Sequence, residues 1–109
     1  MKNIQLTCAH ALVKYLIAQK TLIDEKKVPL FPGVFGIFGH GNVACLGQAL
    51  QENQNELPTW RGHHEQNMAL TGIAYSRAKR RKQIFVATSS VGPGSTNMIT
   101  AAAVAMSNR

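Results

Sequence analysis

The chain has 109 residues, of which 45% are apolar, and a formal net charge of +7. This length builds one domain around one hydrophobic core, which excludes a multidomain enzyme within these residues. A carboxylate-ligated metal site or a glycosidase pair would use most of the five carboxylates that the sequence carries. The positive charge favours anionic partners such as phosphate esters, nucleic acid or acidic membrane surfaces.

Cysteine usage and apolar runs predict a soluble, cytoplasmic protein. Cys8 and Cys45 have no CxxC spacing and are expected to stay reduced. Polar residues interrupt the N-terminal segment, which therefore does not match a secretory leader. The longest apolar run, Ala101 to Met106, is far shorter than the roughly 20 residues that span a bilayer.

Helix and strand patterns alternate along the first half of the chain. Apolar residues at helical spacing predict a helix that follows Thr7, whose hydroxyl can cap the first turn. The charged segment Lys20 to Pro32, with its two prolines, predicts an exposed loop. Val34 to Phe38 is a short apolar run between glycines, as expected of a strand buried on both faces. A second helix is predicted from Val43 to about Gln51.

The second half continues this alternation. Leu57 to Trp60 predicts a short extended piece, and Gln66 to Lys79 predicts a helix. Ile84 to Ala87 lacks polar alternation, which predicts a central, parallel strand. A helix of small residues is predicted from Met98 to Met106, capped by Ser95 or Thr96.

This order of elements predicts an α/β domain on a parallel sheet, with segments 34–38 and 83–88 as adjacent or near-adjacent strands. Parallel sheets usually contain more strands than are found here. The chain is therefore expected to be the first part of a truncated, Rossmann-like domain. Such a part is expected to self-associate or to expose a sizeable apolar patch.

Three loops are expected at the carboxyl ends of the strands, where parallel α/β sheets bind ligands. They contain Gly39-His-Gly-Asn42, the segment that leads to Glu65, and Ser89 to Asn97. Glycine lets the backbone approach a ligand closely. The two glycine loops match neither GxGxxG nor GxxxxGK[ST], so both also fit ordinary tight turns. Glu65 equally fits a first-turn partner of a helix dipole.

Other candidate sites have less support. The four histidines show no metal-ligand spacing, and no GxSxG segment indicates a nucleophile elbow. The basic run Arg77 to Lys82 lies where a helix is predicted to end, and cations there complement the helix dipole and stay solvated. No aromatic residue interleaves this run, which disfavours nucleic-acid binding.

Three segments resemble the N-terminal pyrimidine-binding domain of thiamine-diphosphate enzymes of the acetolactate synthase and pyruvate decarboxylase superfamily. They are RGHHEQNMA (61–69), QIFVAT (83–88) and SVGPGSTN (90–97). FGHGN (38–42) together with TSSVGPG (88–94) is most similar to the branch that opens the ring of trihydroxycyclohexane-1,2-dione in myo-inositol catabolism. The resemblance implies thiamine diphosphate and Mg²⁺ as cofactors and C–C hydrolase activity for the complete enzyme.

The resemblance also implies roles for single residues. A glutamate at the position of Glu65 hydrogen-bonds N1′ of the cofactor's aminopyrimidine and so favours deprotonation of the thiazolium C2. A dry site would raise the pKa of that carboxyl. The Gly92-Pro93-Gly94 turn is expected to pass near the pyrimidine ring, and Asn97 is expected to contact the cofactor. His40 and Asn42 border the substrate space, where His40 can donate a hydrogen bond or exchange a proton.

The chain also departs from the family pattern. Other members carry proline where this chain has His40, which favours a substrate unlike pyruvate. The Gly-Asp-Gly segment and the downstream Asn that hold magnesium against the diphosphate have no counterpart here. The family's site lies between two subunits, so the expected partners are the remaining domains and a second subunit in a homo-oligomer. The isolated chain is expected neither to bind thiamine diphosphate tightly nor to turn over a cyclic dione.

Other functions stay open at this point. The chain also fits an acetolactate synthase-like or other thiamine-diphosphate lyase or carboligase, and a non-catalytic or regulatory domain of the superfamily. A basic module that binds polyanions is a further alternative. That last function predicts salt-dependent affinity and no role for Glu65.

Overall fold

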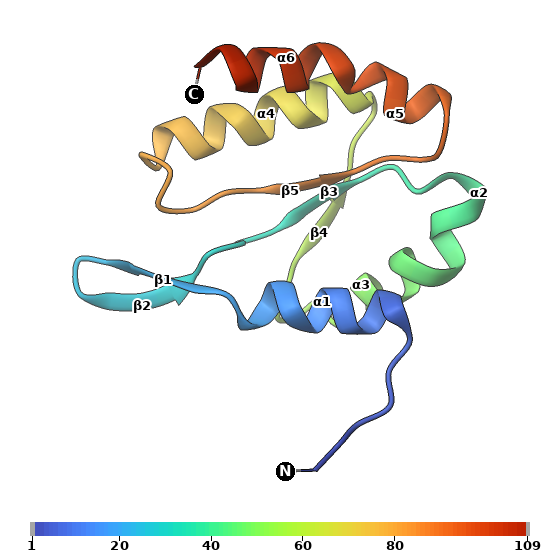
Figure 1. Cartoon of the computed structure of the whole chain (residues 1–109), viewed down its shortest axis with the longest axis vertical. Coiled ribbons are helices and arrows are strands. Elements are labelled where there is room, and N and C mark those ends of the chain that lie inside the picture. Colours follow the sequence, from blue (N-terminus) through green and yellow to red (C-terminus); the bar gives the residue numbers. More distant parts are fainter. Residues whose placement is uncertain (1, 109) are drawn as a thin grey trace.

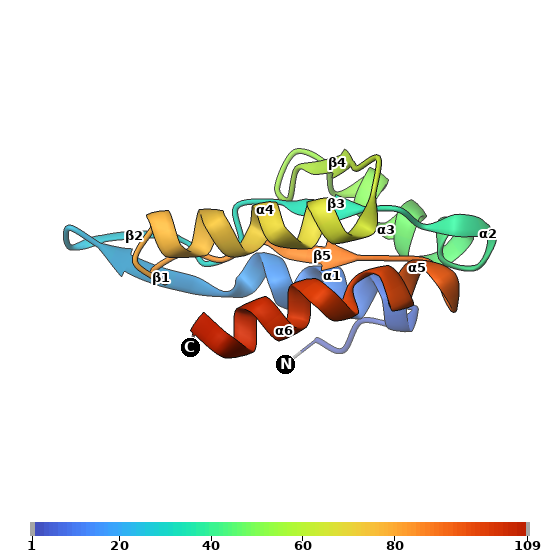
Figure 2. The same ribbon diagram turned by 90° about the horizontal axis from the view of Figure 1, so that it is seen from above.

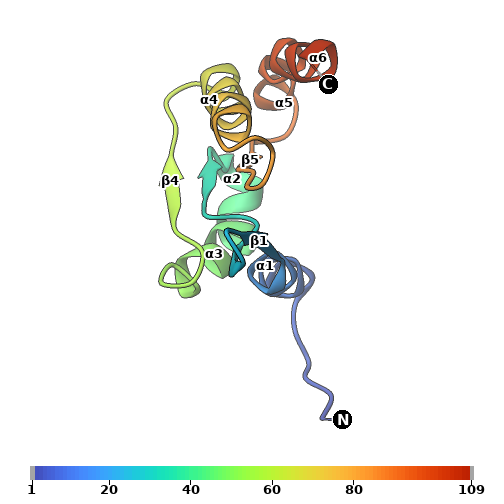
Figure 3. The same cartoon turned by 90° about the vertical axis from the view of Figure 1, so that its left-hand side faces the viewer.

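The computed structural model describes residues 2–108, which form a layered α/β fold (Figure 1). A three-stranded parallel sheet lies between two layers of helices. The first layer contains α1 (Cys8–Ala18) and α3 (Gln48–Glu52), and the second contains α4 (Glu65–Ala78) and α6 (Ile99–Asn108) (Figure 3). The predicted α/β class with a parallel sheet is confirmed.

The sheet has the order β4-β3-β5. Its strands are β3 (Val34–Gly36), β4 (Thr59–Arg61) and β5 (Val86–Thr88). β3 pairs in parallel with both neighbours, which confirms the predicted pairing of segments 34–38 and 83–88. The prediction that the second of these strands is central is wrong, because β5 lies at one edge of this described sheet. A strand without polar alternation must have both faces of its sheet covered, and helices cover them here. Burial of both faces does not require a neighbouring strand at each edge.

An antiparallel hairpin replaces the predicted loop from Lys20 to Pro32. β1 (Lys20–Ile23) and β2 (Lys26–Pro29) pair across a two-residue turn and extend beyond the parallel sheet (Figure 1). Asp24 and Glu25 form this turn with φ of 50° and 64°. Positive φ at both central residues matches the twist of a tight hairpin. The turn was missed because it lacks the glycine that usually signals this conformation.

The segment Gly39-His-Gly-Asn42 is helical, so the predicted turn is wrong. α2 (Gly39–Asn42) leads into a π-helical turn, η1 (Val43–Gly47), which continues into α3. The helical stretch therefore begins four residues before the predicted Val43. The chain reverses at Gly39, whose φ of 63° lets the helix follow β3 almost directly. A Cβ at this glycine would lie 2.6 Å from the Cβ of Ser90.

The predicted C-terminal helix corresponds to α6, which begins at Ile99, but a short helix that was not predicted precedes it. α5 (Pro93–Asn97) precedes α6, with Gly92 as its N-cap and proline in its first turn, where a missing N–H costs nothing. Ser95 and Thr96 therefore lie inside α5 and do not cap the following helix. Their hydroxyls donate to the carbonyl oxygens of Ser90 and Gly92 at 2.9 and 3.1 Å.

The main core lies between the sheet and the layer of α1 and α3. Its fully buried members are Val13, Val34, Ala49, Leu50 and Leu57. The predicted cap is confirmed, because the Thr7 hydroxyl accepts a hydrogen bond from the backbone N–H of His10 at 3.2 Å.

Polar contacts also hold α1 to the α3 segment. His10 Nε2 lies 2.6 Å from Glu52 Oε2, and Lys14 Nζ donates to Asn53 Oδ1 at 2.8 Å. This contact with His10 is the main reason why the pKa of Glu52 lies below its ordinary value of 4.5.

The helix layer on the other face of the sheet, formed by α4 and α6, leaves apolar side chains exposed to solvent. α4 and α6 lie side by side (Figure 2), and α6 exposes 64% of Ile99 and 71% of Met106. Self-association of the chain stays a prediction. Within residues 2–108, no helix has the length and apolar character required to cross a membrane.

Candidate functional site

The topology places a switch point between β3 and β5. The helices that follow β3 lie on one side of the sheet, and those that follow β5 lie on the other (Figure 3). Ligands bind at such switch points, outside the carboxyl ends of adjacent strands. The two loops meet here, because Asn42 Nδ2 donates to the carbonyl oxygen of Ser89 at 3.0 Å and Gly39 packs against Ser90. The fold therefore brings together the loops that follow β3 and β5.

A carboxylate lies near this switch point. Glu65 is the first residue of α4 and is half-buried. Its Oε2 accepts a hydrogen bond from Asn97 Nδ2 at 3.2 Å. A Cβ on the buried Gly94 would lie 3.0 Å from Glu65 Oε1 and 2.4 Å from Ser90 Oγ. Glycine at position 94 is therefore what allows the backbone of α5 to approach the carboxylate so closely.

The environment of Glu65 favours its charged form. The pKa of its carboxyl lies below the ordinary 4.5, first because Asn97 donates to it and second because of a backbone hydrogen bond at the helix start. The raised pKa that the resemblance implies belongs to a dry site with bound cofactor and stays a prediction for the complete enzyme. The carboxylate is only partly covered, and its hydrogen bonds outweigh the desolvation that would favour the neutral acid.

Replacing Asn97 by alanine is expected to raise the pKa of Glu65 towards 4.5, since the largest cause of its lowering is removed. A carboxyl whose folded pKa is lowered stabilises the fold above its unfolded pKa, and this contribution is lost as pH falls through the folded pKa. Asn97→Ala should therefore also flatten the loss of stability below pH 4.5. The carboxyl carbon shift of Glu65, followed by NMR against pH, measures the change. Thr96→Ala is the matched control, since that hydroxyl bonds only within its own turn, and an unchanged Glu65 pKa in Asn97→Ala would contradict the assignment.

The other predicted site residues are spread around the switch point. His40 is exposed on α2, and its side chain makes no hydrogen bond within the described residues. Asn42 lies at the contact between the two loops. Gly92 and Pro93 are exposed at the start of α5. In the structure Glu65 therefore contacts both Gly94 and Asn97, whereas His40 lies apart from them on the surface.

One residue at this end of the sheet received no role from the sequence. Arg61 ends β4 and lines a cavity of about 400 Å³ together with residues of the β3 loop. Its position at the carboxyl end of a parallel strand is the signal that marks it.

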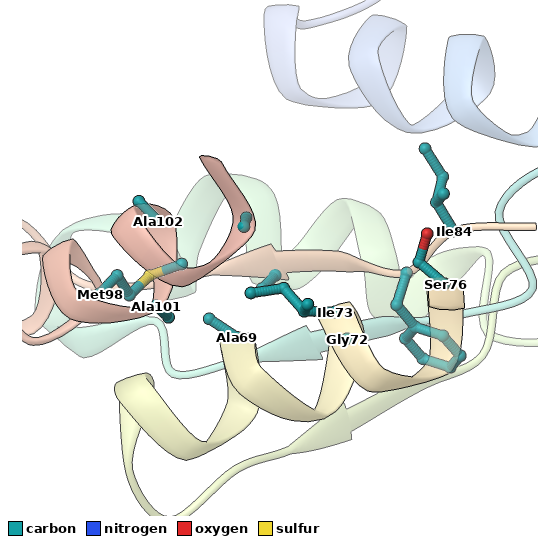
Figure 4. Close-up of a pocket in the computed structure, with 11 residues that line it drawn as sticks. Ala69, Gly72, Ile73, Ser76, Ile84, Met98, Ala101 and Ala102 are labelled. Atoms are coloured by element: carbon teal, nitrogen blue, oxygen red, sulfur yellow. The ribbon is translucent and has the colours of Figure 1, made fainter. Parts of the chain in front are cut away.

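A second groove, of about 300 Å³, lies between α4 and the C-terminal helices (Figure 4). Ala69 and Ile73 face Met98 and Ala101 across it. No charged side chain lines this groove, so it offers no acid, base or ion ligand. Across residues 2–108, no three His, Cys, Asp or Glu side chains come together as a metal site. The basic run 77–82 is exposed at the opposite end of α4 from Glu65.

A family model described as thiamine pyrophosphate enzyme, N-terminal TPP binding domain, matches residues 31–109. The chain belongs to this thiamine pyrophosphate enzyme family. The matched part of the TPP binding domain contains the whole parallel sheet and every candidate site residue. The resemblance predicted from the sequence segments is confirmed at the level of the family.

Relatives of known name are also similar over nearly the whole chain. A 3D-(3,5/4)-trihydroxycyclohexane-1,2-dione hydrolase from Geobacillus thermodenitrificans (strain NG80-2) is 53% identical over 108 residues. Proteins of the same name from Bacillus thuringiensis (strain Al Hakam) and Bacillus cereus (strain 03BB102) are each 51% identical over 108 residues. In each case the alignment covers 99% of this chain and 17% of the relative. This TPP binding domain therefore spans about a sixth of the length of these relatives.

Proposed function

We propose that this chain is the pyrimidine-binding part of a thiamine-diphosphate-dependent hydrolase that opens a cyclic 1,2-dione. The identity of 53% over 108 residues to a hydrolase of that name supports the substrate class. The observation that carries the proposal is the contact of Glu65 with Asn97 and Gly94 at the carboxyl ends of the strands. This arrangement provides a hydrogen-bonding carboxylate held in place between Asn97 and the backbone at Gly94.

The residues present fit the aminopyrimidine of the cofactor. Glu65 Oε1 points towards Gly94, while Oε2 is held by Asn97. A carboxylate held at one oxygen can accept a hydrogen bond from a ring nitrogen at the other. The missing side chain at Gly94 lets Ser90 and Glu65 pack closely against the backbone of α5, which fixes the position of the carboxylate. When bound, thiamine diphosphate supplies an electron sink that allows a C–C bond beside a carbonyl to break.

The chain's own residues then have defined tasks. Glu65 holds a proton at N1′ of the pyrimidine, and Asn97 orients its carboxylate. The turn Gly92-Pro93-Gly94 packs beside the ring. His40 and Asn42 border the substrate, where His40 donates a hydrogen bond or exchanges a proton with a dione or its hydrate. The exposure of His40 leaves it accessible for this role.

The remaining parts of the site lie outside the described residues. Residues 2–108 offer no set of carboxylates that fits magnesium. We assign Mg²⁺ and the diphosphate to other domains and to a second subunit of a cytoplasmic homo-oligomer.

A chimera tests this function. Residues 1–109 replace the matching N-terminal part of the Geobacillus thermodenitrificans hydrolase, to which they are 53% identical. The chimera is expected to open trihydroxycyclohexane-1,2-dione at a rate within about tenfold of the unmodified enzyme, since tenfold corresponds to only about 1.4 kcal/mol of barrier. Pyruvate serves as the competing substrate. A folded, cofactor-loaded chimera that makes acetolactate from pyruvate and leaves the dione intact would replace this function by that of a carboligase.

A further inference from the structure

We propose that Arg61 binds the carboxylate group that ring cleavage creates, so that the chain contributes a product-binding residue as well as a cofactor-binding one. This inference rests on the proposed function, because it takes the substrate to be a cyclic 1,2-dione. Its evidence is the cavity beside Arg61 and the charge balance around it.

The cavity lies at the carboxyl ends of β3 and β4. Arg61 pairs with Gly36 in the sheet, and both residues line the space. The full lining consists of Gly36, Ile37, Phe38, Gly39, Val43 and Arg61. Its volume is about 400 Å³, which is within the range of small-molecule sites. Arg61 is the only lining residue with a charged side chain, so the cavity has apolar walls and one cation.

The positive charge of Arg61 is not neutralised within residues 2–108. The guanidinium forms no salt bridge with a carboxylate of the described residues. Three of the five carboxylates of the chain have other partners. Glu52 pairs with His10 and Glu56 with Lys14, and Glu65 accepts a hydrogen bond from Asn97. The other two, Asp24 and Glu25, form the turn of the β1–β2 hairpin. The cation is therefore free to bind an external anion.

A short series of contacts connects this cavity to the Glu65 site. Gly39 lines the cavity and packs against Ser90. Ser90 Oγ lies close to Gly94, which in turn faces Glu65 Oε1. Arg61 also precedes Glu65 by only four residues, at the same end of the sheet. The cavity and the proposed cofactor site are therefore linked through Gly39, Ser90 and Gly94.

The chemistry of ring opening explains why a cation is useful here. Water adds across the bond between the two adjacent carbonyl carbons: one carbon keeps its oxygen, gains the hydroxyl and becomes a carboxylic acid. The other carbon takes a hydrogen and becomes an aldehyde. The acid loses its proton at neutral pH, so a neutral ring becomes an anionic open chain. A guanidinium binds a carboxylate through two parallel N–H donors, and the exposure of Arg61 leaves these donors accessible.

The experiment uses the chain itself, without cofactor, and glucuronate as a six-carbon sugar-acid probe. Backbone amide signals are followed by NMR at about 0.15 M salt, which screens non-specific attraction to the basic surface. Glucuronate is expected to shift the signals of Gly36 and Gly39, whereas the neutral ring myo-inositol is not. Arg61→Gln should weaken glucuronate binding about tenfold or more, because a charge-assisted contact is lost. Arg61→Lys should weaken it less, since the charge remains without the paired donors.

Arg77→Gln is the matched control, because this arginine is exposed in the last turn of α4 and does not line the cavity. It should leave the affinity unchanged. Equal affinity of Arg61→Gln and the original chain, no shifts at Gly36 and Gly39, or shifts confined to the basic run 77–82 would each overturn the proposal. The assay contains no cofactor and measures no turnover, so it separates a failure at Arg61 from a failure of the proposed cofactor chemistry.

Discussion

Glu65→Gln is expected to slow hydrogen–deuterium exchange at C2 of bound thiamine diphosphate about 10²- to 10⁴-fold, the usual contribution of a positioned proton-transfer group. Glutamine keeps the size of the side chain and can still accept a hydrogen bond from Asn97 at Oε1. It cannot share a carboxyl proton with N1′ of the pyrimidine. Turnover should fall by a similar factor while folding changes little. Exchange is measured in the chimera described above, at saturating cofactor and magnesium.

The competing role of Glu65 predicts a different result. A carboxylate that only complements the dipole of α4 contributes about 0.3–1 kcal/mol of stability and has no effect on exchange at C2. Glu56→Gln provides the matched control, because Glu56 is exposed and its partner is Lys14, 3.9 Å away. This control should retain the original exchange rate. If Glu65→Gln and the unmodified chimera exchange at the same rate, Glu65 does not activate the cofactor.

Gly94→Ala is expected to lower turnover of the chimera about 10²-fold, the size of effect that a displacement of about 1 Å in a catalytic group can produce. The new Cβ would lie 2.4 Å from Ser90 Oγ and 3.0 Å from Glu65 Oε1. Both atoms are ends of side chains, which can move aside, so the fold should persist. The carboxylate, however, would be pushed away from its position beside Asn97. Activity and urea unfolding are measured on the same protein to separate the two effects.

Gly72→Ala is the control for this substitution. Gly72 lies inside α4, and a Cβ there would make an ordinary contact of 3.5 Å with the Cβ of Phe85. The Gly72→Ala chimera should be as active as the unmodified chimera. A Gly94→Ala protein with full turnover would show that the position of Glu65 tolerates a side chain at this site. A Gly94→Ala protein that fails to fold would show that the contact is structural, because Ser90 and Glu65 then could not move.

The relation of Asn97 to Glu65 shows why the site could be predicted only in part. The sequence indicated Glu65 at a helix start and Asn97 in a glycine-containing loop, because caps, glycines and apolar periodicity are local signals. The 3.2 Å hydrogen bond between these side chains joins residues 32 positions apart. It also determines the direction in which the pKa of Glu65 moves. No local pattern carries that information.

The same division holds for the fold. Local residue patterns by themselves determined the helix capped by Thr7, the start of α4 near Glu65 and the parallel class of the sheet, since each depends on apolar spacing or on a cap within a few residues. Only the tertiary structure decided the edge position of β5, the hairpin around Asp24 and Glu25, and the cavity beside Arg61. Strand order, pairing across a turn without glycine and the partners of a long side chain all depend on contacts between distant segments. Such contacts form when layers of the fold pack together, and the free energy of that packing outweighs local preference.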